Sequence, residues 1–162
     1  MGVPRTTLIE EAQRILGGSL FNKGYSFEER PLGELDEFWF VKQPSNTNEM
    51  FHIVEFRPSG FSDQDLFKMG VNLIRQNFHD PFTVPTDFIG KVDLGIPLAP
   101  NLWQSGGEKF HYWHFVSLSD VRQVYKDVLE KLIEYGIPFL EDPAANNETW
   151  QRWGITAFKR PK

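Results

Sequence analysis

Residues 117–141 have the sequence SLSDVRQVYKDVLEKLIEYGIPFLE, and this stretch decides the fold of the chain. Its apolar residues recur at three- and four-residue spacing, which places them on one face of a helix. They are Leu118, Val121, Val124, Tyr125, Val128, Leu129, Leu132 and Ile133. Charged residues fill the opposite face, so the helix has to bury one apolar stripe against another element. We expect that element to be a β-sheet.

Capping residues mark both ends of this helix. Ser117, with Asp120 three residues later, resembles a capping box, and Ser119 is a competing N-cap. At the other end, Gly136 predicts a left-handed residue just after the last turn. Pro138 then predicts that the helix does not continue, because proline lacks the backbone N–H that the next turn needs.

The rest of the chain predicts one earlier helix and a series of strands. Residues 6–21 carry an apolar stripe behind a capping box that begins at Thr7, and Gly24 is the expected C-cap. Segments bounded by turn formers predict strands over residues 25–30, 37–43, 50–57, 66–75, 88–94 and 109–116. A Pro-Ser-Asn-Thr-Asn turn between residues 37–43 and 50–57 predicts an antiparallel hairpin. Residues 50–57 are apolar on both faces, which predicts a central strand.

This order of elements predicts an α+β fold rather than a parallel, doubly wound one. We expect two layers: an antiparallel sheet of about five to six strands, with an N-terminal and a C-terminal helix packed on one face. The rings of Tyr135 and Phe139 are expected to pack against the sheet. A short helix is expected near residues 146–153. Residues 1–162 are expected to form a single domain, with a flexible tail from about residue 155.

The composition narrows the classes of function. The chain has 17 basic and 22 acidic residues and a net charge of −5, so neither nucleic acid nor membrane is an expected partner. It has no cysteine, which excludes disulfides and thiolate chemistry. No apolar run approaches the ~20 residues of a membrane span. Because the N-terminus also lacks the apolar segment of a signal peptide, we expect a cytoplasmic location.

Aromatic residues are unusually frequent, at 15% of the chain. They are interpreted either as a sheet core built from rings or as the lining of a ligand groove or partner surface. The proline-rich residues 76–108 predict little regular structure. A connection of that length is either a functional loop or conceals an element that the pattern does not reveal.

Familiar catalytic motifs are absent from the sequence. There is no GxSxG elbow, no phosphate-binding glycine loop and no HExxH. His111 and His114 lie three residues apart on an expected strand, so they point to opposite faces and cannot chelate one ion. We therefore expect no metal and no cofactor, and no catalytic residue is assigned. The acidic residues Glu28, Glu29, Glu34, Asp36 and Glu37 are interpreted as a solvated loop between two strands.

A combination of rings and cations near the expected strand ends is the better candidate for a ligand- or partner-binding site. Its members are Arg57, Arg75, Trp103, His111, Trp113 and His114. Such a set suits a small anion or a peptide. The alternative is a strand edge that is covered by its own loop.

Several of these segments together resemble a bacterial family catalogued as a domain of unknown function. The resemblance runs from about residue 6 to residue 141. It rests on a strand with the sequence FKMGVNL (67–73), on YWHF (112–115), and on the helix that ends in YGIPFLE (135–141). It implies an α+β fold and no established activity. Some relatives look like small accessory or immunity-type proteins.

Two hypotheses of function follow. The first is a non-enzymatic binding protein of accessory or immunity type that meets a protein partner through an aromatic surface near residues 76–116. The alternative is an enzyme or sensor that binds a small molecule in a pocket between sheet and helix. In that case the polar groups would be Arg57, Arg75, His111 and His114.

Overall fold

The structure is a computed structural model that describes residues 2–30, 37–43, 51–62, 65–76, 92–97 and 113–142. At residues 74–76 and 92–97, and at Arg30, Tyr135 and Phe139, it describes the backbone alone. The expected packing of Tyr135 and Phe139 therefore lies outside the described side chains. The expected helix near residues 146–153 and the tail from residue 155 lie outside the described residues as well.

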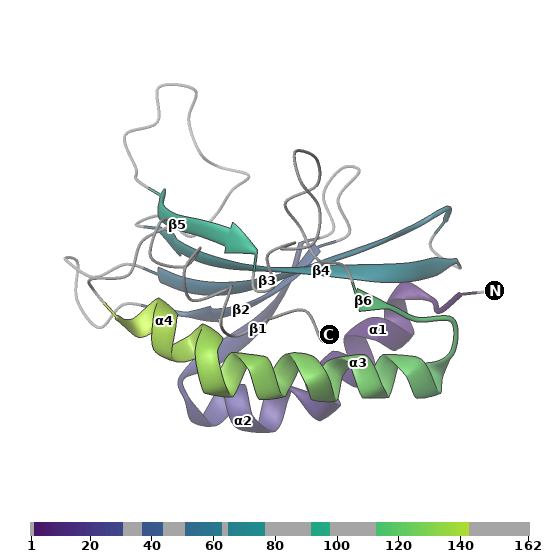
Figure 1. The fold of residues 1–162 in the computed structure, drawn as a ribbon, viewed down its shortest axis with the longest axis horizontal. Helices are drawn as coiled ribbons and strands as arrows, with labels where there is room; N and C mark the ends of the chain where they lie inside the picture. Colours follow the sequence, from purple (N-terminus) through teal and green to yellow (C-terminus); the bar gives the residue numbers. More distant parts are fainter. Residues whose placement is uncertain are drawn as a thin grey trace, which may run out of the picture.

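The described chain forms an α+β fold with one layer of sheet and one layer of helices (Figure 1). The helices are α1 (Arg5–Ile15), α2 (Gly17–Asn22), α3 (Leu118–Lys131) and α4 (Ile137–Glu141), with a π-helical turn, η1 (Leu132–Gly136), between the last two. The strands are β1 (Tyr25–Arg30), β2 (Glu37–Lys42), β3 (Phe51–Gly60), β4 (Leu66–Gln76), β5 (Val92–Pro97) and β6 (Trp113–His114). The helices of the described residues lie on one face of the sheet, as predicted.

The strands of the described chain form a single antiparallel sheet in the order β1-β2-β3-β4-β5, with β6 paired to β4. The predicted hairpin is confirmed as β2 and β3, and β3 is the predicted central strand. Of the predicted strand at 88–94, the described residues 92–94 lie in β5 (Val92–Pro97), which continues beyond the predicted end. Of the predicted strand at 109–116, residues 113–116 are described, and the strand β6 covers Trp113–His114.

The start of α3 is capped as the sequence predicts. The Ser117 hydroxyl accepts a hydrogen bond from the Asp120 backbone N–H at 3.2 Å, and the Asp120 carboxylate accepts one from the Val116 N–H at 3.0 Å. These two bonds satisfy backbone donors that a helix start otherwise leaves open. The bond from Val116 is also the main reason why the pKa of Asp120 is lowered.

The predicted end of this helix at Gly136 is wrong. In the described residues a positive φ occurs at Gly2 and Gly24, not at Gly136, and helical structure continues to Glu141. The backbone widens into η1, where the Ile137 N–H bonds to the Leu132 carbonyl. A π turn of this kind shifts the hydrogen-bond register just before Pro138. Continuing the helix also buries Ile137 and Leu140 in the core.

The predicted first helix is two helices with a different start. No side chain caps α1, which begins after Pro4, so the expected capping box at Thr7 is wrong. Pro4 has the extended backbone of an N-cap. The chain turns at Leu16 into α2, and both Leu16 and Leu20 are fully buried. Gly24 ends this segment with φ +92°, the left-handed conformation predicted for it.

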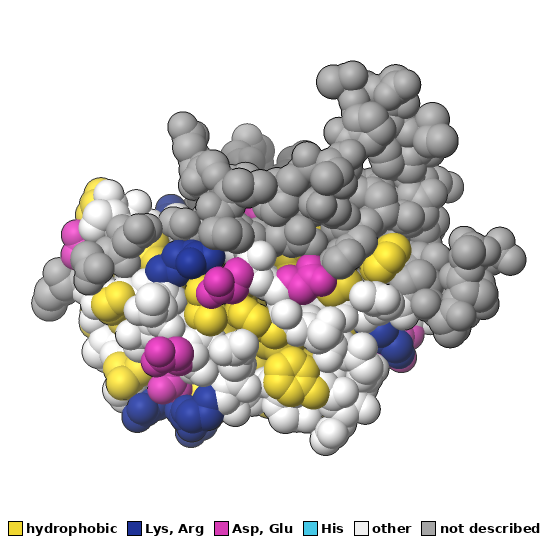
Figure 2. Space-filling view, turned by 180° about the vertical axis from the view of Figure 1, so that it is seen from behind, with side chains coloured by type: hydrophobic (Ala, Val, Ile, Leu, Met, Phe, Trp, Pro, Cys, Tyr) yellow, Lys and Arg dark blue, Asp and Glu magenta, His cyan; other side chains and the backbone are white. Residues whose placement is uncertain are grey.

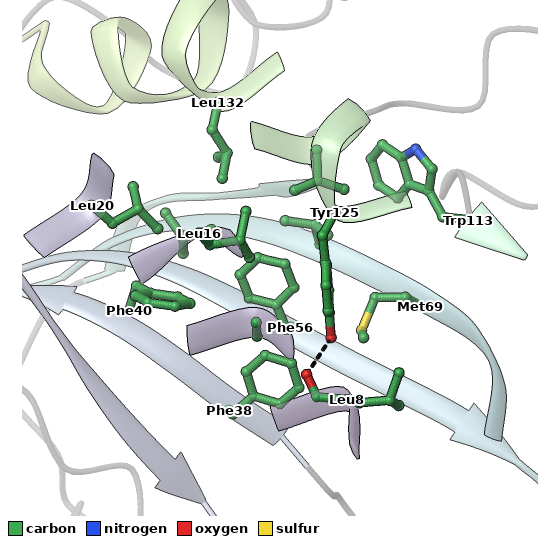
Figure 3. Packing of buried hydrophobic residues seen from close by; sticks show 14 of the residues in the cluster. Leu8, Leu16, Leu20, Phe38, Phe40, Phe56, Met69, Trp113, Tyr125 and Leu132 are labelled. Atoms are coloured by element: carbon green, nitrogen blue, oxygen red, sulfur yellow. Dashed lines mark hydrogen bonds between the residues drawn. The ribbon is translucent and has the colours of Figure 1, made fainter. Parts of the chain in front are cut away.

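The core lies between the sheet and the helices, and rings dominate it (Figure 3). Phe38 and Phe56, opposite each other on β2 and β3, stack with centroids 5.1 Å apart. Phe40 and Tyr125 each meet the Phe56 ring edge to face. Such pairs add to the free energy gained by burying apolar area. Phe56 is therefore the centre of the interface between the layers.

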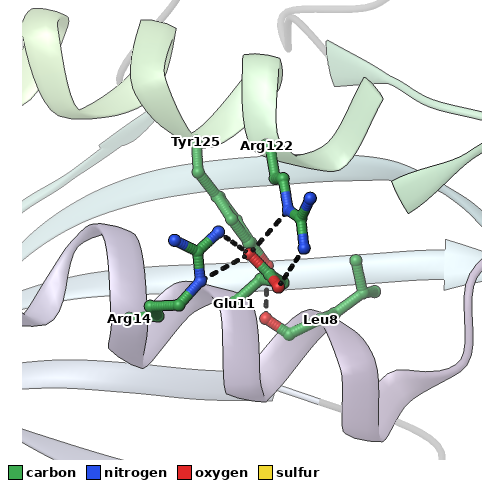
Figure 4. A network of polar contacts seen from close by, with 5 residues as sticks. All are labelled: Leu8, Glu11, Arg14, Arg122 and Tyr125. Carbon is green, nitrogen blue, oxygen red and sulfur yellow. Dashed lines mark hydrogen bonds and ion pairs between the residues drawn. The ribbon is translucent and has the colours of Figure 1, made fainter. Parts of the chain in front are cut away.

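Polar contacts join α1 to α3 on the helical side (Figure 4). The Tyr125 hydroxyl donates a 2.8 Å hydrogen bond to the Leu8 carbonyl. The buried Glu11 carboxylate accepts hydrogen bonds from Arg14, one turn further along α1, and from Arg122 on α3. These arginines lower the pKa of Glu11. The network aligns the two helices rather than forming an open site.

Candidate functional site

The face of the sheet that points away from the helices, called the outer face below, carries buried charge. Alternation along β2 and β3 sends Phe38, Val54 and Phe56 to the helices. It sends Trp39, Val41 and Ile53 to the outer face, where they form a second apolar cluster. Glu37, Glu55 and Arg57 belong to the same face by register. The predicted double-sided burial of β3 is thus confirmed.

Five residues on three adjacent strands form what we call the outer-face cluster. They are Glu37 and Trp39 on β2, Glu55 and Arg57 on β3, and Asn72 on β4. Trp39 lies opposite Glu55, which in turn lies opposite Asn72. Glu37 and Glu55 are only 7% and 6% exposed. Burial of this degree is rare for a carboxyl group unless hydrogen bonds or charges compensate it.

The two carboxyl groups are held by neighbouring donors. Glu37 accepts hydrogen bonds from the Trp39 indole Nε1 at 3.1 Å and from Arg57 Nε at 2.9 Å. Glu55 accepts a hydrogen bond from Asn72 Nδ2 at 2.9 Å. Arg57 Nε also lies 3.1 Å from Glu55 Oε1. One guanidinium nitrogen therefore contacts both carboxyl groups and keeps them side by side.

This arrangement changes the acidity of Glu55. Burial is the largest cause and the Glu37 charge the second, and together they raise the pKa of Glu55 from 4.5 to about 7. The hydrogen bond from Asn72 and the charge of Arg57 lower that pKa, but by less. A carboxyl group with a pKa near neutrality is suited to taking up and releasing protons at physiological pH.

A second feature is an exposed aromatic residue at the turn between β3 and β4. Phe61 directly follows β3 and is 89% exposed, and its ring centroid lies 5.2 Å from that of Phe67. The turn is closed by hydrogen bonds from the Asp65 N–H to the Ser62 carbonyl and from the Ser62 hydroxyl to the Asp65 carboxylate. We call Gly60, Phe61, Ser62, Asp65 and Phe67 the hairpin tip.

Gly60 allows the two arms of the hairpin tip to approach closely. A Cβ atom built at Gly60 would lie 2.2 Å from the Asp65 carbonyl oxygen, which no other residue type tolerates without a backbone shift. The strand register also shifts between Ser59 and Gly60. The bulge and the missing side chain together fix the backbone that presents Phe61.

The site residues predicted from the sequence do not form one site among the described side chains. Arg57 lies on the outer face, opposite Gly70. Trp113 lies opposite Met69, so it faces the helices, where its indole donates a 2.7 Å hydrogen bond to Asp127 on α3. Arg57 and Trp113 thus point to opposite faces of the sheet.

The other predicted residues are placed as follows. His114 is exposed and lies opposite Lys68. The backbone of Arg75 pairs with β3 and β5, but its side chain is outside the described set. Trp103 and His111 lie outside the described residues. Among those that are described, no three metal-binding side chains are close enough to hold an ion.

The sequence interpretation missed the outer-face cluster. It predicted a strand from Glu37 correctly, but it also interpreted Glu37 as part of a solvated acidic run, which is wrong, because Glu37 is buried beside Arg57. A usable signal was the position of Glu55 inside a strand that is apolar on both faces. The same alternation that places Ile53 on the outer face places Glu55 and Arg57 there too.

Apolar side chains are interspersed with acidic and basic ones on the described surface seen from behind (Figure 2). Within the described part of the chain, no helix has both the length and the apolarity needed to cross a membrane.

No protein-family model, curated protein or solved structure matches the chain, so the resemblance to a bacterial family of unknown function stays a prediction.

Proposed function

We propose that this chain is a non-enzymatic binding protein, of accessory or immunity type, that recognises a protein partner through the hairpin tip. The observation that carries this proposal is the 89% exposure of Phe61. Aromatic residues are enriched in protein interfaces, where they often act as anchors. An aromatic ring left in water contributes little to the stability of the free monomer. The aromatic surface predicted near residues 76–116 lies largely outside the described residues.

The surroundings of Phe61 support this role. The ring is presented next to Phe67, so a partner would find two adjacent rings. The turn beneath them is held by its own hydrogen bonds and by the close approach at Gly60. An anchor that is already ordered loses less conformational entropy when it binds.

Affinity capture with the full chain tests the proposal. We expect the wild-type chain to recover a specific protein from a lysate of the source organism. With that protein purified, Phe61→Ala should weaken the affinity by about 30-fold or more, equal to ~2 kcal/mol for an anchor residue. Ile133→Ala is the matched control, since Ile133 is an exposed apolar residue on the helical layer.

The outcomes separate clearly. Loss of binding in Phe61→Ala alone supports the hairpin tip as the interface. Equal binding by the wild type and both variants contradicts it, and so does the recovery of no specific protein by the wild type. Circular dichroism of each variant should be unchanged, because both side chains are exposed and their truncation leaves no buried cavity.

One observation favours the second candidate function, an enzyme or sensor for a small molecule. Glu55, with a pKa of about 7 beside a second carboxyl group, has the acidity expected of a general acid or base. Glu55 lies on the outer face rather than between sheet and helices, so such chemistry would use the outer face. A thermal-shift screen against metabolites tests it. A ligand at 100 times its dissociation constant should stabilise the wild type by about 2.7 kcal/mol, and Glu55→Gln should abolish the shift.

A further inference from the structure

The outer-face cluster brings two buried carboxyl groups to one arginine. Both Glu37 Oε1 and Glu55 Oε1 lie within 3.1 Å of Arg57 Nε, and Arg57 Nη2 lies 2.9 Å from Glu37 Oε1. If both carboxyl groups were ionised, two buried negative charges would share one contacting cation. The cluster would then carry an uncompensated buried charge, which is costly in a region of low dielectric constant.

The neighbouring strands add few described charges that face the pair. On β1, Glu28 lies opposite Trp39, and Arg30, described by its backbone alone, lies opposite Glu37. On β4, the residues of the same face are the neutral Asn72 and Gly70 and then Lys68, which lies opposite Ser59 rather than Glu55. Within the described side chains, the charges that contact the pair directly are therefore those of Arg57 and of the two carboxylates themselves.

One proton resolves this imbalance. If it resides between the two carboxyl groups, the cluster has one negative and one positive charge and is neutral overall. A protonated carboxyl group also becomes a donor, so one glutamate can hydrogen-bond to the other. The raised pKa of Glu55, with the Glu37 charge as its second cause and a hydrogen bond to Glu37 among the others, agrees with this geometry.

We propose that Glu37 and Glu55 share a single proton and thereby act as a pH-sensitive lock between β2 and β3 on the outer face. With the proton present, a carboxyl–carboxyl hydrogen bond and a neutral cluster join the two strands. Its release to solvent leaves two carboxylates that repel each other across the strand pair. The inference does not depend on the proposed function, because it concerns a different surface from the hairpin tip.

Nuclear magnetic resonance of the full chain with labelled glutamate carboxyl carbons tests the shared proton directly. In a titration between pH 5 and 9, the wild type should show one glutamate with a midpoint near 7. Glu55→Gln should remove this transition. Glu37→Gln should lower its midpoint, because the neighbouring negative charge is gone. Glu11→Gln, which replaces a buried carboxylate on the helical side, is the control variant and should leave the midpoint unchanged.

Amide hydrogen exchange tests the lock. When the pH rises from 6 to 8, the exchange rates of the backbone amides of the paired residues Trp39 and Glu55 should increase several-fold more in the wild type than in Glu55→Gln. The neutral glutamine side chain of that variant imitates the protonated glutamate. Equal acceleration in both chains would overturn the switch. A wild type in which every glutamate titrates below pH 5.5 would overturn the shared proton, and that result needs no variant to fold.

Discussion

Strands β2 and β3 are buried on both faces of the sheet, but the two faces are chemically different. On the face toward the helices, Phe38, Phe40 and Phe56 are fully buried among apolar side chains. On the outer face, Trp39 and Ile53 are also buried, but beside two carboxyl groups and an arginine. Consecutive residues of β2 and β3 therefore lie in two different environments: an apolar one toward the helices and one with buried charges on the outer face.

The inner face contributes mainly to stability, whereas the outer face is the better candidate for a functional role. The inner face gains free energy simply by removing rings from water. The outer face buries carboxyl groups that Arg57, Asn72 and Trp39 compensate through hydrogen bonds and charge. Replacing such a buried charge cluster by apolar residues of similar size often leaves a protein equally stable or more stable. Charges kept at such a cost are good candidates for a functional role.

Phe56→Ala is the most severe test of the inner face. It removes the ring that contacts Phe38, Phe40 and Tyr125, so we expect a loss of about 3–5 kcal/mol in the free energy of unfolding, measured by urea denaturation. Phe61→Ala, at an exposed ring, should change stability by less than about 0.5 kcal/mol. Similar losses in the two variants would mean that the core is not centred on Phe56.

The pH dependence of stability tests the outer face. Folding raises the pKa of Glu55 from 4.5 to about 7, so the folded chain holds a proton that the unfolded chain has released. This contribution is complete below pH 4.5 and is lost as the pH rises through 7, by about 3 kcal/mol at most. Urea denaturation at pH 5 and 8 should show the loss in the wild type and not in Glu55→Gln.

The two carboxyl groups with lowered pKa values do not obscure that result. The pKa values of Glu11 and Asp120 fall on folding, so these groups are ionised throughout pH 5–8 and lose their contribution only at lower pH. A wild type whose stability is the same at pH 5 and pH 8, as expected for Glu55→Gln, would contradict the assignment of a proton to Glu55.

Tyr125→Phe probes a single polar contact on the inner face. The variant keeps the ring beside Phe56 and removes only the hydroxyl that donates to the Leu8 carbonyl. We expect a loss of about 1 kcal/mol, independent of pH between 5 and 8, because burial raises the pKa of Tyr125 and keeps it protonated. A loss that varied with pH across this range would link Tyr125 to the outer-face titration.

Glu141→Gln gives the smallest expected effect and sets the scale for an exposed ion pair. Glu141 lies 3.3 Å from Lys42 at the end of α4, and both side chains are more than one-third exposed. Solvent screening should hold the change to about 0.5 kcal/mol or less in urea denaturation. A change as large as the pH-dependent loss assigned to Glu55, about 3 kcal/mol, would erase the distinction between exposed and buried charge.

Much of the architecture was predictable because it follows from local patterns. The spacing of Val121, Tyr125 and Val128 predicts the buried face of α3, and Ser117 predicts its start. The helix end was not predictable, because the burial of Ile137 and Leu140 outweighs the stop signal at Gly136 and Pro138. The unfavourable local propensity is ~1 kcal/mol for Gly and up to ~3 kcal/mol for Pro. Burial of two large apolar side chains contributes about 3–6 kcal/mol.

The candidate site was less predictable than the fold. Arg57 was identified from the sequence, but its partners Glu37 and Glu55 are 18 residues apart in number and meet only when β2 pairs with β3. Trp113 was expected beside Arg57, yet strand pairing turns it toward Asp127 on α3. Which side chains meet across strands depends on register, and one residue of shift reverses every face.

The sequence by itself determined the α+β class, the antiparallel hairpin and the amphipathic face of α3, because periodicity and turn chemistry act within a few residues. The tertiary structure alone decided that Glu37 and Glu55 share Arg57, that Phe61 is left exposed, and that helical structure passes through Pro138. These features depend on burial and on contacts between distant segments. Burial sets the dielectric environment, and with it the acidity of Glu55, in a way that no local pattern encodes.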